Sequence, residues 1–275
     1  MAVVLALLSS ALWGTSDFLG GLYSRHRPPY AVVAGSQACG LVLIGAVALG
    51  TSAWHGPLDW LPWAVGAGLA GSGALICFYA ALAAGTMGVV SPIAALGAVV
   101  PVVFGFLAGE SPSTTALIGI ALALAGAVAA SGPELQGRAG ARPVLLAALA
   151  GVGFGVALIL IAEGSESDAL MTLTGMRATS VLGFVVAALV LRTRGGLTAV
   201  DVPSLAVIGG GDVGANLLYA LASQRGFLSI TSVLGSLYPV ATVLLARIVL
   251  HERLRPVQQA GVTGALAGVV LVSLG

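Results

Sequence analysis

The chain has 275 residues, of which 58% are hydrophobic and only 8% are charged, and its formal net charge is +1 at pH 7. A soluble domain carries about 25% charged residues, so this composition excludes a water-soluble fold for most of the chain. The near-zero charge also argues against a nucleic-acid partner, because binding to phosphates requires a basic face. We therefore expect an all-α integral membrane protein.

Ten apolar segments of suitable length follow one another along the chain. A hydrocarbon core of about 30 Å needs about 20 apolar residues per helix. Charges, prolines and polar clusters separate candidate helices at 2–23, 30–50, 61–84, 87–108, 114–131, 143–163, 168–191, 203–224, 229–250 and 257–274. The connections are too short for a soluble domain. A signal peptide is the alternative for the first segment, but this segment lacks a basic start and stays apolar beyond the usual length.

The two halves of the sequence repeat each other. A polar linker, 133–142, separates a first repeat at 1–132 from a second at 143–275. The corresponding positions are Trp13 and Phe154, Gly14 and Gly155, Tyr79 and Tyr219, Ser91 and Ser229, Pro101 and Pro239, Glu110 and Glu252, Gly119 and Gly261, and Gly126 and Gly268. Five helices are an odd number, so the second repeat is expected to enter the membrane from the opposite face. Inverted repeats of this kind are typical of secondary transporters, whose substrate site lies between the halves near mid-membrane.

This pattern resembles the EamA type of the drug/metabolite transporter superfamily. The resemblance rests on Trp13-Gly14, on Tyr219-Ala220-Leu221, on a serine followed by a proline, on Glu252-Arg253-Leu254 and on the closing glycine-rich helix. It implies a ten-helix bundle around a central cavity and the export of amino acids or related metabolites. The chain departs from the family pattern at Gln37, where many members have arginine, as the second half does at Arg177.

Three charged residues, Asp17, Arg177 and Asp212, fall well inside predicted helices. A charge at that depth costs about 2.5–3.5 kcal/mol on insertion scales. Arg177 and Asp212 each lie nine residues into a helix, which is about 13 Å deep at the rise of an α-helix. We expect both near mid-membrane, where opposite charges offset each other's desolvation. A transport role and a structural ion pair are both open for this pair.

Polar residues also recur on single helix faces. Asn216, Tyr219 and Ser223 follow Asp212 at helical spacing. Polar faces directed at lipid are unfavourable, so such faces point into a cavity or at each other. For the serines, a structural hydrogen bond to the carbonyl four residues earlier is the favoured alternative. The candidate substrate-binding or cavity residues are Trp13, Asp17, Gln37, Tyr79, Arg177, Asp212, Asn216, Tyr219, Ser229 and Ser232, and the candidate hinges are Pro101 and Pro239.

One motif points to a different class of protein. The run from Gly209 to Gly214 matches the glycine pattern of a dinucleotide site, but no acidic residue stands about 20 positions further on, as such a site requires. The three histidines occur at unrelated spacings. With no metal-binding spacing, catalytic triad or phosphate loop in the sequence, we expect no enzyme, no cofactor and no metal.

The arginines predict an orientation in the membrane. Most fall in loops on one face of a ten-helix chain: Arg25, Arg27, Arg138, Arg142, Arg192, Arg194, Arg253 and Arg255. The positive-inside rule makes this face cytoplasmic and places both termini outside. The family resemblance implies cytoplasmic termini instead, so both orientations stay open.

Two functional hypotheses follow. The first is a secondary carrier in the cell membrane that exports an amino acid or similar zwitterion by alternating access. In it Arg177 attracts a carboxylate, and Asp212 attracts an ammonium group or a coupling proton. A multidrug or cation efflux carrier is the alternative within the superfamily. The second hypothesis is a membrane enzyme or non-transporting scaffold, in which the polar network only locks helices together.

Overall fold

The computed structural model describes residues 1–24, 26–51, 53, 56–84, 93–130, 141–190, 192, 195–249 and 255–274. For eight residues within helices the structure describes the backbone and not the side chain: Tyr79, Leu82, Ala83, Ala84, Pro239, Val243, Ala246 and Arg247. Ser91, Glu252 and the predicted linker up to residue 140 lie outside the described residues.

The described chain is helical, and no strand occurs within these ranges. The first half contains α1 (Ala2–Tyr23), α2 (Pro29–Leu49), α3 (Leu61–Ala84), the 3-10 helix η2 (Leu96–Ala98), α5 (Val99–Leu107) and α6 (Thr114–Ala130). The second half contains α7 (Ala141–Val190), the 3-10 helix η3 (Ala199–Asp201), α8 (Val202–Ser223), α9 (Leu228–Gly235), α10 (Tyr238–Val249) and α11 (Pro256–Leu274).

The long element α7 consists of two helices that meet at Asp168. This residue has extended backbone angles (φ −158°, ψ 109°) within an otherwise helical run. Its carboxylate accepts a hydrogen bond from the backbone N–H of Met171 at 2.8 Å, as an N-cap residue does at the start of a helix. Asp168 therefore ends one helix and begins the next, close to the boundary predicted from the sequence.

The surface of the molecule is that of a membrane protein. Six helices of the described chain are long and apolar enough to cross a bilayer. Large apolar side chains such as Val42 and Leu182 point outward, whereas many fully buried positions are alanines such as Ala64 and Ala123. Small residues inside and large apolar ones outside suit helices that pack in lipid. The total of ten crossings stays a prediction.

The helix predicted at 229–250 is interrupted. It consists of α9, which ends at Gly235, and α10, which begins at Tyr238. In the corresponding part of the first half, η2 precedes α5. Each proline of the pair Pro101 and Pro239 lies in the first turn of the helix that follows, where its missing N–H breaks no hydrogen bond. The prolines therefore mark helix starts, and their role as hinges stays a prediction.

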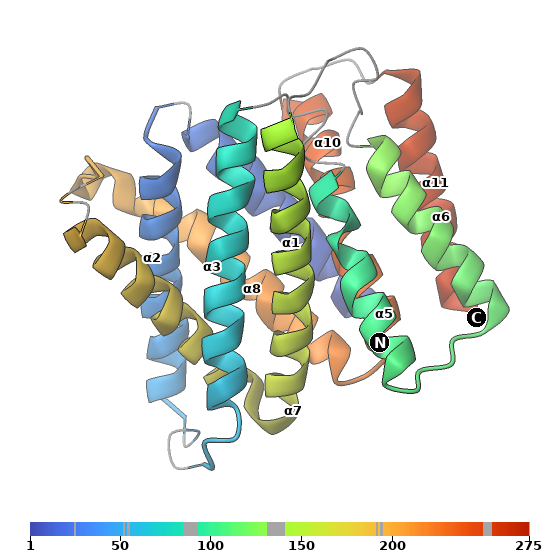
Figure 1. Ribbon diagram of the computed structural model, residues 1–275, viewed down its shortest axis with the longest axis horizontal. Helices are drawn as coiled ribbons and strands as arrows, with labels where there is room; N and C mark the ends of the chain where they lie inside the picture. Colours follow the sequence, from blue (N-terminus) through green and yellow to red (C-terminus); the bar gives the residue numbers. More distant parts are fainter. Residues whose placement is uncertain are drawn as a thin grey trace.

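Glycines bring α6 and α11 into contact along one end of the molecule, where the two helices lie side by side (Figure 1). A Cβ atom on Gly119 would lie 2.8 Å from the carbonyl oxygen of Gly268. A Cβ atom on Gly126 would lie 2.8 Å from the carbonyl oxygen of Gly261. Because the contacts run in opposite order along the two helices, α6 and α11 are antiparallel.

Gly126→Ala is expected to lower the free energy of unfolding by about 1–3 kcal/mol, because overpacking forces backbones apart. Its new Cβ would lie 2.3 Å from the backbone nitrogen of Ala265. Gly45→Ala in α2 is the matched control, since no atom lies within 4 Å of its Cβ position and alanine favours the helix. Unfolding in detergent micelles measures both variants. A Gly126→Ala variant as stable as Gly45→Ala would contradict the close contact.

Candidate functional site

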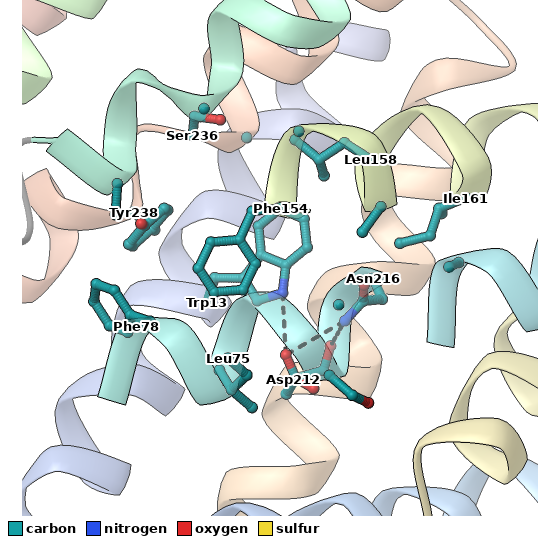
Figure 2. Close-up of a pocket in the computed structure, with 18 of the residues that line it drawn as sticks. Trp13, Leu75, Phe78, Phe154, Leu158, Ile161, Asp212, Asn216, Ser236 and Tyr238 are labelled. Carbon is teal, nitrogen blue, oxygen red and sulfur yellow. Dashed lines mark hydrogen bonds between the residues drawn. The ribbon is translucent and has the colours of Figure 1, made fainter. Parts of the chain in front are cut away.

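A cavity of about 160 Å³ lies between helices of the two halves (Figure 2). Its walls come from α1, α2, α3, α7 and α8, from η2, and from the break between α9 and α10. The polar side chains that line it are Asp17, Gln37, Ser72, Arg177, Ser180, Asp212, Asn216 and Ser236, and four aromatic side chains are Trp13, Phe78, Phe154 and Tyr238. A protein cavity of about 150 Å³ holds one benzene molecule, so this cavity suits a small solute.

Arg177 of α7 and Asp212 of α8 form an ion pair in the cavity wall. The guanidinium also donates a hydrogen bond to Oε1 of Gln37 on α2. Arg177 is only 3% exposed, and a charge buried to that extent is stable only when it is paired. The ion pair and the hydrogen bond to Gln37 therefore join α7, α8 and α2. The two opposite charges expected near mid-membrane lie in direct contact.

Asp212 is held by two further side chains. Its Oδ1 accepts hydrogen bonds from Nε1 of Trp13 at 3.1 Å and from Nδ2 of Asn216 at 3.3 Å (Figure 2). Asn216 also donates to the backbone carbonyl of Asp212 at 2.7 Å. Trp13 thus ties α1 to α8, and this carboxylate is orientated from three directions.

Asp17 of α1 lines the same cavity but, unlike Asp212, has no ion-pair partner among the described side chains. Its side chain is exposed to the cavity. Of the side chains that the structure describes, none donates a hydrogen bond to this carboxylate or forms an ion pair with it. Asp17 does interact electrostatically with Asp212 and Tyr238. The cavity therefore contains one paired and one unpaired carboxylate.

Three sequence-predicted residues, Tyr219, Ser229 and Ser232, do not line the cavity. Each is 0% exposed. The Tyr219 hydroxyl shares a hydrogen bond of 2.8 Å with Ser232 and donates one of 3.2 Å to the carbonyl of Leu158. The Tyr219 ring packs against Trp13, with 5.8 Å between ring centroids. Tyr219 and Ser232 therefore pack behind the cavity wall, and a role of these three residues in substrate binding stays a prediction.

The other predicted positions divide into three groups. Trp13, Asp17, Gln37, Arg177, Asp212 and Asn216 meet at the cavity. Pro101 is buried in α5 and does not line it. The side chains of Tyr79 and Pro239 lie outside the described residues.

Asp201 joins the two halves at the start of α8, and sequence analysis did not identify it. Its Oδ1 accepts hydrogen bonds from the Tyr23 hydroxyl and from Nε of Arg27, the latter at 2.9 Å. Its Oδ2 accepts bonds from the Thr198 backbone N–H at 2.7 Å and hydroxyl at 2.8 Å. The sequence does contain a signal, since Thr198 and Asp201 have the spacing of a capping box.

Glu110 connects the halves at another helix end. Its carboxylate accepts hydrogen bonds from the backbone N–H groups of Leu228 and Ser229, the latter at 3.0 Å. These N–H groups belong to the first turn of α9, where the chain leaves donors free and an anion is favoured. A side chain from the first half thus caps a helix of the second half.

The fold and the site define a multi-pass helical membrane protein with a charged cavity enclosed between its two halves. The EamA-like transporter family model matches residues 1–132 and 141–274. The chain therefore belongs to the EamA-like transporter family, which confirms the resemblance, and it is a membrane transporter of the drug/metabolite type with a small-molecule substrate.

One solved structure is similar along almost the whole chain. It is described only as "Crystal structure of protein", and it aligns with a TM-score of 0.82 and 21% identity over 99% of this chain and 96% of that chain. At this identity the similarity shows the fold alone. No curated protein matches the chain.

Proposed function

We propose that the protein is a secondary carrier of the cell membrane that moves a small polar metabolite through the central cavity by alternating access. Amino acids and related amines are the proposed substrates. The observation that carries the proposal is the cavity itself, which is of metabolite size and contains the Arg177–Asp212 pair and the unpaired Asp17. A scaffold needs only satisfied polar contacts, and an unpaired carboxylate facing a cavity is unfavourable there.

The 3-10 segment η2 and the break between α9 and α10 support this site assignment. Gly97 and Ala98 of η2, and Gly235 and Ser236 at the end of α9, all line the cavity. In secondary transporters the substrate site is formed by discontinuous helices at the interface between repeats. Both segments, which depart from regular α-helix, therefore lie where a carrier needs adaptable backbone.

We further propose that the halves are inverted repeats, related by a two-fold axis through the cavity. The first repeat contributes the glycine pair Gly119 and Gly126, and the second contributes Gly261 and Gly268. The first glycine of each pair contacts the second glycine of the other: Gly119 contacts Gly268, and Gly261 contacts Gly126. A two-fold axis produces such reciprocal contacts. Because α6 and α11 occupy equivalent positions and are antiparallel, the two repeats would cross the bilayer in opposite directions.

Two further contacts fit the same axis. Gln37 and Arg177 are equivalent positions and bond each other directly, as residues on an axis do. In addition, Gly14 packs on the carbonyl of Tyr238, and Gly155 packs on that of Gly97. Gly14 thus contacts the break between α9 and α10, and Gly155 contacts η2 of the opposite half. This arrangement would let the two repeats rock against each other.

Exchange across liposomes tests the proposal. Vesicles containing the purified protein are loaded with one unlabelled solute, and uptake of the labelled solute is measured for amino acids, amines and nucleosides. Ser72→Trp should abolish exchange, because it fills the cavity. Val42→Trp is the control, since Val42 is 71% exposed on the outer surface of α2. Absence of exchange for every solute, or full exchange by a folded Ser72→Trp variant, would contradict carriage through this cavity.

We propose that the direction is export and that protons drive it. An acidic cavity can take up protons in place of substrate, so proton entry could be exchanged for solute exit. An imposed pH gradient should therefore drive net solute movement in the same vesicles. Net solute movement that does not change with the pH gradient would contradict proton coupling and would indicate facilitated diffusion.

A further inference from the structure

The charges in the cavity do not balance. Among the described residues, its lining contains the carboxylates of Asp17 and Asp212 and the guanidinium of Arg177. Arg177 is already paired with Asp212 and bonded to Gln37. The carboxyl group of Asp17 is left without a cationic partner among the described side chains. A substrate carboxylate would find no free cation here, whereas a substrate cation would stabilise the ionised form of Asp17 and pair with it.

The surroundings of Asp17 make a cation more favourable still. Asp212 lies close enough to repel it electrostatically. An unpaired charge within the bilayer is costly, and Coulomb interactions are stronger there than in water. A bound ammonium group would offset this repulsion, because it would provide the counter-ion that no described side chain supplies.

Aromatic rings form much of the remaining wall. Trp13, Phe78, Phe154 and Tyr238 are gathered around the cavity (Figure 2). Phe78 and Phe154 meet edge to face, with 5.9 Å between their centroids. Aromatic faces attract ammonium ions through their quadrupoles, most strongly in sites shielded from water. A carboxylate beside aromatic rings is therefore suited to an organic cation.

We propose that Asp17 and these rings bind the ammonium group of the substrate, and that the carrier prefers small organic cations to zwitterions and anions. The inference rests on the proposed function, because it takes the cavity as the transport site. It also changes the role expected for Arg177: this guanidinium holds Asp212 and does not bind a substrate carboxylate. The cavity volume of about 160 Å³ selects compact amines over large hydrophobic drugs.

Binding to the purified protein in lipid nanodiscs tests the preference. The probes are methylammonium, putrescine and choline, together with betaine, which adds a carboxylate, and the neutral isostere of choline, in which carbon replaces the ammonium nitrogen. Calorimetric titration should show binding of at least one cation, and weaker binding of betaine and of the isostere. If no cation binds more tightly than the neutral isostere, the proposal is wrong.

Asp17→Asn should weaken binding of the cation by about tenfold to a hundredfold, the range for a hydrogen bond to a charged group. Asp17→Glu should restore part of it. Glu166→Gln is the matched control, because it removes a carboxylate that is exposed and does not line the cavity. The melting temperature of Asp17→Asn should not fall, since the carboxylate has no described partner to lose. Equal cation binding by Asp17→Asn and wild type would overturn the inference.

Exchange measurements separate this inference from the proposed function. Should the vesicles exchange zwitterions at rates unaffected by Asp17→Asn, the carrier function stands and the cation site is refuted. If cations bind through Asp17 but no solute crosses the membrane, the site stands and the carrier function is refuted.

Discussion

Arg177→Ala is expected to lower the free energy of unfolding by at most about 3–5 kcal/mol, the usual cost of removing one partner from a buried ion pair, since the Asp212 side chain left behind is 28% exposed. The change leaves Asp212 without its cation in the cavity wall, beside the unpaired Asp17. Asp212→Asn should also destabilise the protein, because Arg177 is 3% exposed and would lose its counter-ion. Reversible unfolding in detergent micelles provides the measurement.

The double variant, Arg177→Ala with Asp212→Asn, separates stability from transport. The loss of stability in the double variant should be well below the sum of the losses in the two single variants, because neither charge remains unpaired. Transport should stay impaired, because two side chains of the cavity wall are changed and Trp13 donates to a neutral acceptor in place of a charged one. Recovery of transport together with stability would assign the pair a purely structural role and remove it from the substrate site.

Asp201→Ala is expected to cost about 2–3 kcal/mol, because hydrogen bonds to a charged group contribute more than neutral ones. Asp201 is 2% exposed and accepts four hydrogen bonds, from Tyr23, Arg27 and Thr198. Its loss releases the connection between the end of α1 and the start of α8. Arg27 is 34% exposed, so water partly compensates its charge and keeps the cost below that of Asp212→Asn, which leaves the buried Arg177.

Tyr23→Phe is the graded control for this network. It removes a single donor and leaves the Arg27 ion pair and the capping box in place, so we expect a smaller loss, about 1 kcal/mol. Melting temperatures of both variants in the same detergent give the comparison. A loss for Tyr23→Phe as large as that for Asp201→Ala would mean that the tyrosine ring packing, and not the carboxylate, holds this junction.

The helices were predictable because lipid imposes a simple rule on the sequence. An apolar stretch must be long enough to span the hydrocarbon core, and charges and prolines mark its ends. The predicted segment 2–23 matches α1, and 61–84 matches α3. The depth of Arg177 and Asp212 was predictable for a related reason, since the rise of a helix converts position into depth.

The helix break between Gly235 and Tyr238 was less accessible to sequence reasoning. A proline in the first turn of a new helix and one inside a kinked helix look alike in a sequence. The two are distinguished only by whether the preceding carbonyls find other partners. Here the chain breaks where Gly14 of α1 packs on the carbonyl of Tyr238, a contact between residues far apart in the chain.

Composition and apolar segment length thus determined by themselves that this protein is a helical membrane protein, because those properties depend on local hydropathy. The motifs repeated in order in both halves added the resemblance to the EamA type, which the family model confirms. Which polar residues face the cavity depended on tertiary structure. Asp17 and Tyr219 both lie on polar helix faces, yet Asp17 lines the cavity, and Tyr219 is buried against Ser232 and Leu158. A helix face has neighbours on several sides, and only the packing of all helices decides which side remains open.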